Sequence, residues 1–443
     1  MSQEWVAILA LIALFVVGTV LPINMGALGF VAAWLVGMYS LGLDEKEIIA
    51  GLSGDLVLTL IGVTYLFAIA KNNGTVDLIV RAAVRAVGGR VAFIPWVMFG
   101  VTALLTAIGA ASPAACAIIG PIALGFAGRY SINPLLMGMF VVHGAQGGGF
   151  SPISIYGVIT NTVMEDNGLP VGELTLFFSS LVVNLLIAVV LFVVLGGREL
   201  MSRRIDADEP GRELPAGGGA AGTGGGGPGT GGATVASRTT TQQKVSVEQI
   251  ATLVAFLVVA ALALIFDRNI GFTAITAAVV LAALFPRAQK GAVSQIAWST
   301  VLLVAGVSTF AAILSAAGAP EYVGGWAAGL GAVVLGALVL CYVGGVVSAF
   351  ASSTALLPII IPIAIPLIAE GGISAVAIVS ALAISSTIVD VSPFSTNGAL
   401  MVANRPDTVD EEGFYRQILG YSAIVVVVGP LLVWAALVLP GWL

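Results

Sequence analysis

The stretch Ala111-Ser-Pro-Ala-Ala-Cys-Ala-Ile-Ile-Gly-Pro-Ile-Ala-Leu124 aligns without gaps with Ser352-Ser-Thr-Ala-Leu-Leu-Pro-Ile-Ile-Ile-Pro-Ile-Ala-Ile365, and seven of fourteen positions are identical. The same offset sets Phe150-Ser-Pro-Ile-Ser-Ile-Tyr-Gly157 against Val391-Ser-Pro-Phe-Ser-Thr-Asn-Gly398, where Ser, Pro, Ser and Gly coincide. A fixed offset over two separate motifs indicates a duplicated unit. The chain therefore consists of two related halves.

The composition predicts a membrane protein built from helices. Of 443 residues, 58% are hydrophobic and only 9% are charged, against about 25% charged in a soluble domain. Apolar stretches of about 17 to 25 residues recur along the chain, and each is long enough to cross a hydrocarbon core. We therefore expect an all-α polytopic fold. The two cysteines, Cys116 and Cys341, lie in apolar segments and predict neither a disulfide framework nor a thiolate metal site.

The first half, residues 1–198, carries five predicted spans and one predicted re-entrant hairpin. The spans lie near 5–21, 25–42, 54–71, 135–160 and 172–197. An amphipathic piece covers 74–89, and an apolar segment over 91–127 is interrupted at Gly109–Pro113, which predicts a hairpin that enters and returns. The first span follows Met-Ser-Gln-Glu without a basic region, so we expect a permanent span rather than a signal peptide.

The second half, residues 246–443, has the same layout after a Gly-rich segment. Residues 199–245 have the composition of a flexible linker and are expected to be disordered. Ser246 and Gln249 form a capping-box pattern that predicts the next helix start. The spans lie near 247–266, 270–286, 299–316, 373–398 and 414–440, with an amphipathic piece at 319–330 and a hairpin over 332–369 broken at Ser352–Thr354.

Five crossings in the first half place the start of the second half on the opposite side of the membrane, so the two repeats are expected to be inverted. Inverted repeats are typical of secondary transporters. Of the 17 Lys and Arg residues, only Lys46 and Arg268 fall on one side of this topology. The positive-inside rule makes the other side cytoplasmic. We therefore expect a bacterial-type cytoplasmic (inner) membrane protein with a cytoplasmic linker and periplasmic termini.

Four breaks interrupt the predicted helices at equivalent positions, two hairpin tips and two unwound segments. Irregular backbone at membrane depth is tolerated where it is buried in protein or lines a cavity, and helix N-termini suit an anion. Small residues also serve close helix packing, but four symmetric breaks favour a binding site. The predicted substrate-binding residues are Ser112, Pro113, Ser151, Ser154, Ser353, Thr354, Ser392, Ser395, Thr396 and Asn397.

Two ionisable residues lie within predicted spans, where a charge is costly and is commonly functional. Asp390 precedes the second unwound segment and is expected to bind a cation, carry a proton or accept backbone hydrogen bonds. His143 is the only histidine; it is expected either to relay protons near neutral pH or to pack as a neutral, hydrogen-bonded side chain. The predicted coupling residues are Ser352, Ser353, Asp390 and His143.

The sequence contains none of the zinc-protease, hydrolase-elbow, Walker A or CxxC motifs, so we expect no enzyme and no resident cofactor. Transport would then draw on an ion gradient. A channel is less favoured because a pore shows rings of like charge or a repeated filter. There is no basic patch that would predict a nucleic-acid partner.

Several motifs resemble the MatC dicarboxylate carriers nearly from end to end. They are Leu21-Pro-Ile-Asn-Met-Gly-Ala27, Val63-Thr-Tyr-Leu-Phe-Ala-Ile-Ala70, His143-Gly-Ala-Gln146, Gly149-Phe-Ser-Pro-Ile-Ser-Ile-Tyr-Gly157 and Ser392-Pro-Phe-Ser-Thr-Asn-Gly-Ala-Leu400. This resemblance implies transport of malonate first and of four-carbon dicarboxylates second, by cation-coupled import. An anion exchanger and a carrier for another carboxylate or anion remain alternatives.

More distantly, the layout resembles the divalent anion:sodium symporters, ion transporters whose hairpin tips carry Ser-Asn-Thr triplets that hold a substrate carboxylate and sodium. That resemblance implies a homodimer and an elevator mechanism. Ser352-Ser353-Thr354 matches the triplet with Ser in place of Asn, whereas Ala111-Ser112-Pro113 keeps little of it. Sodium at the hairpin tips and a proton are therefore both candidates for the coupling ion.

Overall fold

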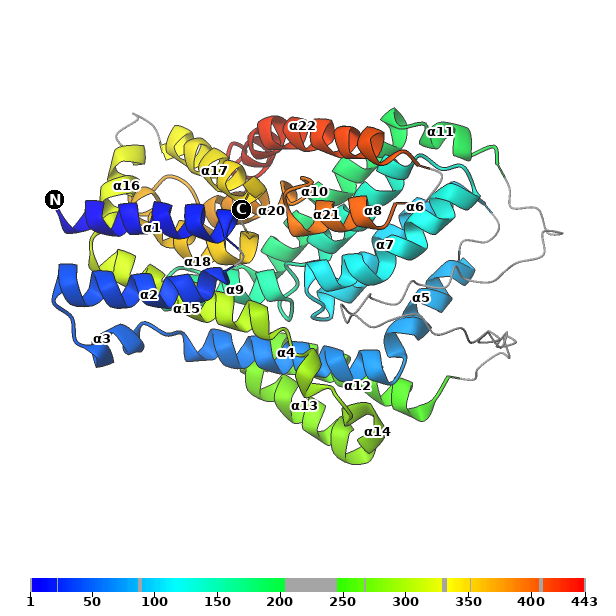
Figure 1. Ribbon diagram of the computed structural model, residues 1–443, viewed down its shortest axis with the longest axis horizontal. Coiled ribbons are helices and arrows are strands. Elements are labelled where there is room, and N and C mark those ends of the chain that lie inside the picture. Colours follow the sequence, from blue (N-terminus) through cyan, green and yellow to red (C-terminus); the bar gives the residue numbers. More distant parts are fainter. Residues whose placement is uncertain are drawn as a thin grey trace, which may run out of the picture.

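The computed structural model describes residues 2–21, 23–86, 90–203, 245–266, 268–328, 333–350, 352–405 and 409–441. Every secondary-structure element in these residues is a helix, as the composition predicted, and most helices run along the long axis of the molecule (Figure 1). Seven described helices are long and apolar enough to cross a membrane: α1, α4, α7, α10, α12, α15 and α22. The chain is a multi-pass membrane protein.

The elements of the first half are α1 (Gln3–Val20), α2 (Met25–Val36), η1 (Gly37–Leu41), α3 (Glu45–Ala50), α4 (Gly54–Asn72), α5 (Thr75–Ala86), α6 (Phe93–Ala107), α7 (Ser112–Arg129), α8 (Pro134–Gly148), α9 (Ile155–Asp166), α10 (Glu173–Val194) and α11 (Gly197–Leu200). Helices α6 and α7 pack together as two arms joined by residues 108–111. Between α8 and α9, residues 149–154 interrupt the helix.

The elements of the second half are α12 (Val247–Leu264), α13 (Ile270–Leu284), α14 (Pro286–Gln289), η2 (Val293–Gln295), α15 (Trp298–Ala316), α16 (Ala319–Ala328), α17 (Val333–Phe350), α18 (Ser353–Ile363), α19 (Ile365–Ala369), α20 (Ala375–Ile388), α21 (Thr396–Ala403) and α22 (Glu411–Leu437). Here α17 and α18 are the packed arms, and residues 389–395 separate α20 from α21.

The two halves are joined by matching helix crossings. Asn24 caps α2 and donates to the Ser299 carbonyl of α15 at 3.0 Å. In the other half, Asn269 caps α13 and donates to Asp55 of α4. Both crossings are close because glycine faces backbone: a Cβ on Gly26 would lie 1.9 Å from the Leu302 carbonyl oxygen, and one on Gly62 would lie 2.7 Å from the Gly271 carbonyl oxygen.

Local details show how the sequence sets these elements. The capping box at the start of α12 is confirmed: the Ser246 hydroxyl accepts from the Gln249 amide at 3.2 Å, and the Gln249 side chain accepts from the Ser246 amide at 3.1 Å. Helix α3 and the π-helix η1 were not predicted. The π-helix η1 ends at Gly42, which has a positive φ.

The predicted linker begins later than residue 199. Helix α11 occupies Gly197–Leu200, and the Arg203 guanidinium donates to the carbonyls of Tyr130 and Ser131 just beyond α7, at 2.6 and 3.3 Å. A basic side chain that satisfies carbonyls at a helix C-terminus fixes the chain there. The remainder of the predicted linker, 204–244, lies outside the described residues.

Candidate functional site

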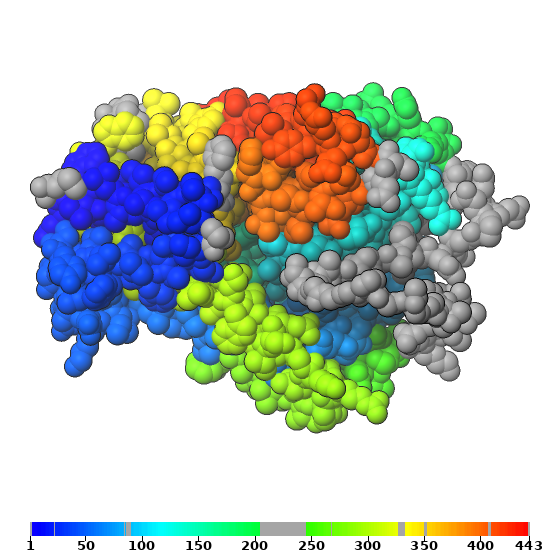
Figure 2. Space-filling view, viewed as in Figure 1, coloured from blue at the N-terminus to red at the C-terminus, as the bar shows by residue number. Residues whose placement is uncertain are grey.

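A pocket of about 460 Å³ lies where the two hairpins and the two interrupted helices meet. The first residues of four helices line it: Ser112 and Pro113 of α7, Ile155 and Tyr156 of α9, Ser353 and Thr354 of α18, and Thr396 of α21 preceded by its cap Ser395. Residues of α1, α2 and α15 complete the wall. In Figure 2 the blue N-terminal helices, the orange α21 and the light green segment containing α15 meet near the middle of the face shown.

Three of these four helix starts have no side-chain cap. Ala111, Ser154 and Ser352, which precede α7, α9 and α18, accept no side-chain hydrogen bond from the backbone amides of the first helical turn. Only α21 is capped, by Ser395, which accepts from the Gly398 amide at 3.4 Å. First-turn N–H groups have no intrahelical partner, and together with the helix dipoles they suit a bound anion.

The second hairpin tip carries two hydroxyl pairs. The Ser353 hydroxyl lies 2.8 Å from the Ser348 hydroxyl and donates to the Ser386 carbonyl at 3.2 Å. The hydroxyls of Ser352 and Thr354 lie 2.6 Å apart. Ser352, Ser353 and Thr354 all line the pocket, so the tip presents several hydroxyl groups to a ligand.

The two Ser-Pro motifs fix the interrupted helices against the hairpins in the same way. Ser151 donates to the carbonyl of Ala107 in α6 at 2.7 Å, and its counterpart Ser392 donates to that of Ala349 in α17 at 2.9 Å. Ser154 and Ser395 repeat a second bond, to the Ser151 and Ser392 carbonyls, at 2.6 and 2.7 Å. Among these four, only Ser395 lines the pocket. The hydroxyls of Ser151, Ser154 and Ser392, which were predicted to bind the substrate, instead donate to backbone carbonyls.

Asp390 is the acidic residue of the pocket, and its carboxylate accepts from the Asn397 amide nitrogen at 2.8 Å. The same nitrogen donates to the Ser112 hydroxyl, also at 2.8 Å. Asn397 does not itself line the pocket, and its fully buried side-chain oxygen has no partner. Asn397 therefore connects the first hairpin tip to Asp390, and a carboxylate, a hydroxyl and an unsatisfied amide oxygen lie together.

His143 lies outside the pocket. It is fully buried in α8, where Nδ1 is 2.8 Å from the Asn184 amide oxygen of α10 and Nε2 is 2.5 Å from the Tyr421 hydroxyl of α22. Because the Asn184 amide nitrogen donates to the Ser180 carbonyl, its oxygen faces the histidine and must accept from Nδ1–H. Nε2 then accepts from Tyr421. The contacts fit a neutral histidine that ties three helices together.

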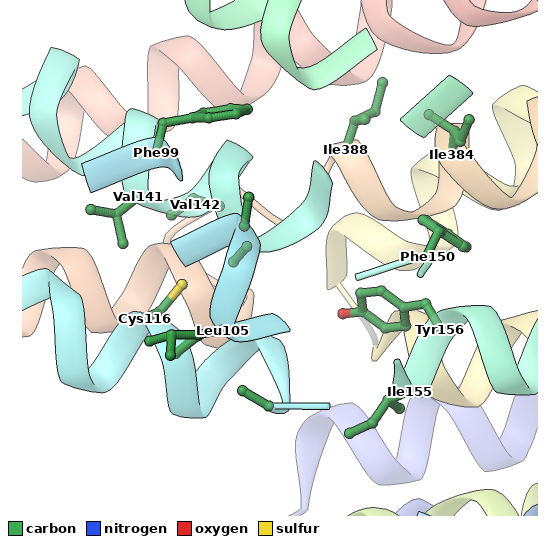
Figure 3. Close-up of a cluster of buried hydrophobic side chains, with 14 of the residues drawn as sticks. Phe99, Leu105, Cys116, Val141, Val142, Phe150, Ile155, Tyr156, Ile384 and Ile388 are labelled. Carbon is green, nitrogen blue, oxygen red and sulfur yellow. The ribbon is translucent and has the colours of Figure 1, made fainter. Parts of the chain in front are cut away.

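Sequence reasoning missed several pocket residues, chiefly Tyr156. In Figure 3 its ring lies between Phe150 and Ile155, and its hydroxyl points toward the side on which Leu105 and Cys116 lie. Phe150 and Tyr156 have ring centroids 5.5 Å apart. The sequence does contain a signal for Tyr156, because this residue aligns with the predicted binding residue Asn397 in the duplicated motif. Ser299, Thr300, Thr19 and Met25 had no comparable signal, since helix packing across the two halves brings them to the pocket.

No Lys or Arg side chain is among the described residues that line the pocket. Nor does any group of three or more His, Cys, Asp and Glu side chains in the described part of the chain form a metal-ligating cluster. Amides, hydroxyls and helix dipoles therefore supply the positive potential, and Asp390 supplies the one formal charge. This arrangement suits reversible binding of an anion together with a neutralising cation.

Two families of carriers are similar to parts of this chain. Residues 1–149 match the family model of the dicarboxylate carrier protein MatC N-terminus, and residues 261–442 match that of the citrate transporters. No curated protein sequence matches the chain. The YdaH transporter of Alcanivorax borkumensis, a crystal structure with an unusual topology, is similar with a TM-score of 0.56 at 16% identity, covering 90% of this chain and 88% of that one.

The structural likeness shows the fold, and the two family matches show the class of protein. One match covers the first hairpin arm α6 and the start of the first interrupted helix, and the other covers the whole second hairpin, Asp390 and α21. The first third of the chain is therefore similar to the MatC dicarboxylate carriers and the second half to the citrate transporters, and both families indicate a secondary transporter of carboxylates rather than an enzyme.

Proposed function

We propose that the protein is a cation-coupled symporter that imports a small dicarboxylate, malonate first and four-carbon dicarboxylates second. The observation that carries this proposal is the convergence of four helix N-termini, three of them uncapped, on a pocket whose described lining contains no basic side chain. N–H groups and dipoles hold carboxylates without the full charge of an arginine. Binding can therefore be reversible on both sides of the membrane.

The two hairpin tips provide two equivalent subsites for the two carboxylates of the substrate. The tips of α7 and α18 are related by the sequence repeat, and each presents a serine hydroxyl, Ser112 or Ser353, beside a helix start. A pocket of about 460 Å³ lies toward the small end of the ligand-site range of about 300–1,000 Å³. It leaves room for a short dianion with its coupling ion and a few waters.

Asp390 supplies the coupling in this proposal. Two like charges about 5 Å apart repel by roughly 3 kcal/mol at an effective dielectric constant of about 20. A dianion in the pocket beside an ionised Asp390 would therefore bind roughly a hundredfold more weakly than beside a neutral one. A proton on Asp390, or a sodium ion held by Asp390, Ser112 and the free Asn397 oxygen, would remove that repulsion.

We further propose that transport follows an elevator mechanism in a homodimer of the inner membrane. The hairpins, the interrupted helices and their hydrogen-bonded neighbours α10 and α22 would carry the pocket past the remaining helices. The supporting feature is that α1, α2 and α15 contribute only part of the pocket wall and that α15 packs against α18 mainly through apolar side chains. Such a surface has few hydrogen bonds that sliding would break.

The test is uptake of radiolabelled malonate by proteoliposomes under an imposed sodium gradient, an imposed proton gradient or neither. We expect saturable uptake that one of the two gradients drives above equilibrium, with competition by succinate and malate. Uptake that needs an internal dicarboxylate and ignores both gradients would identify an exchanger. If no gradient or counter-substrate drives malonate entry, and citrate enters instead, the malonate assignment is wrong.

A further inference from the structure

We infer that Tyr156 is a substrate-contacting residue whose hydroxyl donates to one carboxylate and whose ring limits the length of the dicarboxylate. This inference rests on the proposed function and goes beyond it, because it assigns substrate selection to one half of the pocket. The coupling chemistry belongs to the other half.

The position of Tyr156 places its hydroxyl between the two hairpin tips. The side chain is buried, with 6% of its surface exposed, and that surface lines the pocket. Ser112 and Ser353, one on each tip, line the same pocket close to the phenol. Phe150 holds the ring from behind (Figure 3). A ligand spanning the two tips therefore meets the phenol.

The duplicated motif shows that Tyr156 and Gly149 replace a polar pair. Tyr156 aligns with Asn397, and Gly149 aligns with Asp390. In the second half the two side chains are hydrogen-bonded at 2.8 Å. In the first half a Cβ on Gly149 would lie 2.8 Å from Cδ2 of the Tyr156 ring. Glycine at 149 thus leaves the space that the tyrosine ring occupies.

This paired replacement gives the two halves different chemistry. The Asn397 amide is bound to Asp390 and Ser112, so it is already used within the protein. Gly149 offers no carboxylate to Tyr156. The phenol has the Ser112 and Ser353 hydroxyls near it, which can donate as well as accept, and it shares the pocket with the Asp390 carboxylate, to which no hydrogen bond from it is observed. The phenol O–H can therefore turn to a substrate carboxylate, and a hydrogen bond to a charged group is among the stronger ones.

The ring also sets the space available to the substrate. A tyrosine is much larger than the asparagine at the equivalent position, and its ring, unlike Asn397, lines the pocket and takes up space in the first half. A short dicarboxylate can reach the Tyr156 hydroxyl and the helix starts at the two tips without moving the ring, whereas each added methylene must displace the ring. One methylene changes discrimination by roughly tenfold or more in a fitted pocket.

The test compares Tyr156→Phe and Tyr156→Asn with the matched control Tyr421→Phe, which removes a buried phenol outside the pocket. Each variant is reconstituted at full length, its melting temperature is recorded, and KM is measured for malonate and succinate. We expect Tyr156→Phe to raise the KM for malonate roughly ten- to hundredfold. We expect Tyr156→Asn to shift the malonate-to-succinate KM ratio roughly tenfold toward succinate, and the control to move neither value.

The outcomes separate this inference from the proposed function. Wild-type uptake of malonate with an unchanged KM in Tyr156→Phe and an unchanged KM ratio in Tyr156→Asn would overturn the inference alone. Failure of the wild-type protein to transport any dicarboxylate would overturn both. Because phenylalanine keeps the ring beside Gly149, a folded Tyr156→Phe protein is expected, and the KM ratio of the asparagine variant provides a second reading.

Discussion

In the proposed function, Asp390 interacts with both the dicarboxylate and the coupling cation. Its carboxylate is nearly buried, lies in the wall of the pocket and has one amide donor, Asn397, at 2.8 Å. No Lys or Arg of the described pocket lining compensates its charge. A buried carboxylate without a cationic partner is costly, so it favours a bound proton or cation. The same neutralisation makes the pocket acceptable to an anion.

The first prediction concerns Asp390→Asn, which keeps the shape of the side chain but removes the charge. Without cation and at alkaline pH, we expect malonate to bind the variant roughly a hundredfold more tightly than the wild-type protein, because the repulsion is gone. Gradient-driven accumulation should be lost while malonate exchange continues. Ligand-induced change in melting temperature and proteoliposome uptake measure the two effects.

The control for this variant is Asp55→Asn. Asp55 is an exposed acid in the first turn of α4 that bonds Asn269 and does not line the pocket. Accumulation by the control should still follow the gradient. A variant of Asp390 that accumulates malonate like the wild-type protein would remove Asp390 from coupling.

At single residues, the sequence predicted positions better than roles. Eight of the predicted residues line the pocket: Ser112, Pro113, Ser352, Ser353, Thr354, Asp390, Ser395 and Thr396. Ser151, Ser154 and Ser392 sit in the same motifs but bond backbone carbonyls. A hydroxyl in an unwound segment can bond either a ligand or a backbone carbonyl. The direction of the side chain decides which of the two it bonds. Sequence does not carry that direction.

The interrupted helices depend on glycines that follow the Ser-Pro motifs. A Cβ on Gly157 would lie 2.0 Å from the Ser151 carbonyl oxygen, and one on Gly398 would lie 2.0 Å from that of Ser392. In both cases the atom that the added Cβ would clash with belongs to the backbone of the same break. A side-chain movement therefore cannot relieve the clash. The equivalence of the two distances reflects the same turn built twice.

We predict that Gly157→Ala and Gly398→Ala each lower stability by about 3 kcal/mol, at the upper end of the cost of overpacking. Gly420→Ala in α22 is the matched control, since nothing lies within 4 Å of its added Cβ. Alanine favours a helix over glycine by about 1 kcal/mol, so the control should be neutral or slightly stabilised. Thermal unfolding in detergent measures all three, and equal melting temperatures would contradict this account of the breaks.

A second prediction at the scale of elements tests movement between α15 and α18. Ala311 of α15 and Ala355 of α18 belong to one apolar cluster. In a protein with Cys116 and Cys341 replaced by serine, we expect a short bifunctional thiol reagent to link cysteines at 311 and 355 and to stop uptake. Each single-cysteine variant should remain active after the same treatment. Full uptake by the linked protein would exclude relative movement of these helices.

Predictability at this scale followed the hydrophobic pattern. The long apolar runs, the two breaks and the capping box at Ser246 could be recognised because each has a local signal. The crossings of α2 with α15 and of α4 with α13 could not, because they join residues far apart in sequence through glycine contacts with backbone. Helix α7, an arm of the first hairpin, is also long and apolar enough to cross a membrane, so length and hydropathy alone do not decide whether this arm spans it.

On the scale of the whole molecule, basic residues gather at one end. Figure 1 shows α5, α11 and α14 at one end and the short helix α3 at the other. Arg81 and Arg85 lie on α5, Arg198 on α11 and Arg287 on α14, whereas Lys46 lies on α3. This separation agrees with the sequence-based partition of charges, although the orientation of the ends in the membrane stays a prediction.

The last prediction therefore concerns orientation. The positive-inside rule places the end with α5, α11 and α14 in the cytoplasm and α3 in the periplasm. Lys46→Cys and Ser202→Cys put thiols on exposed positions at the two ends, again without Cys116 and Cys341. A membrane-impermeant thiol reagent added to intact cells, with the outer membrane made permeable, should label residue 46 at once and residue 202 only after lysis. The reverse pattern would place the linker outside and invert the proposed direction of import.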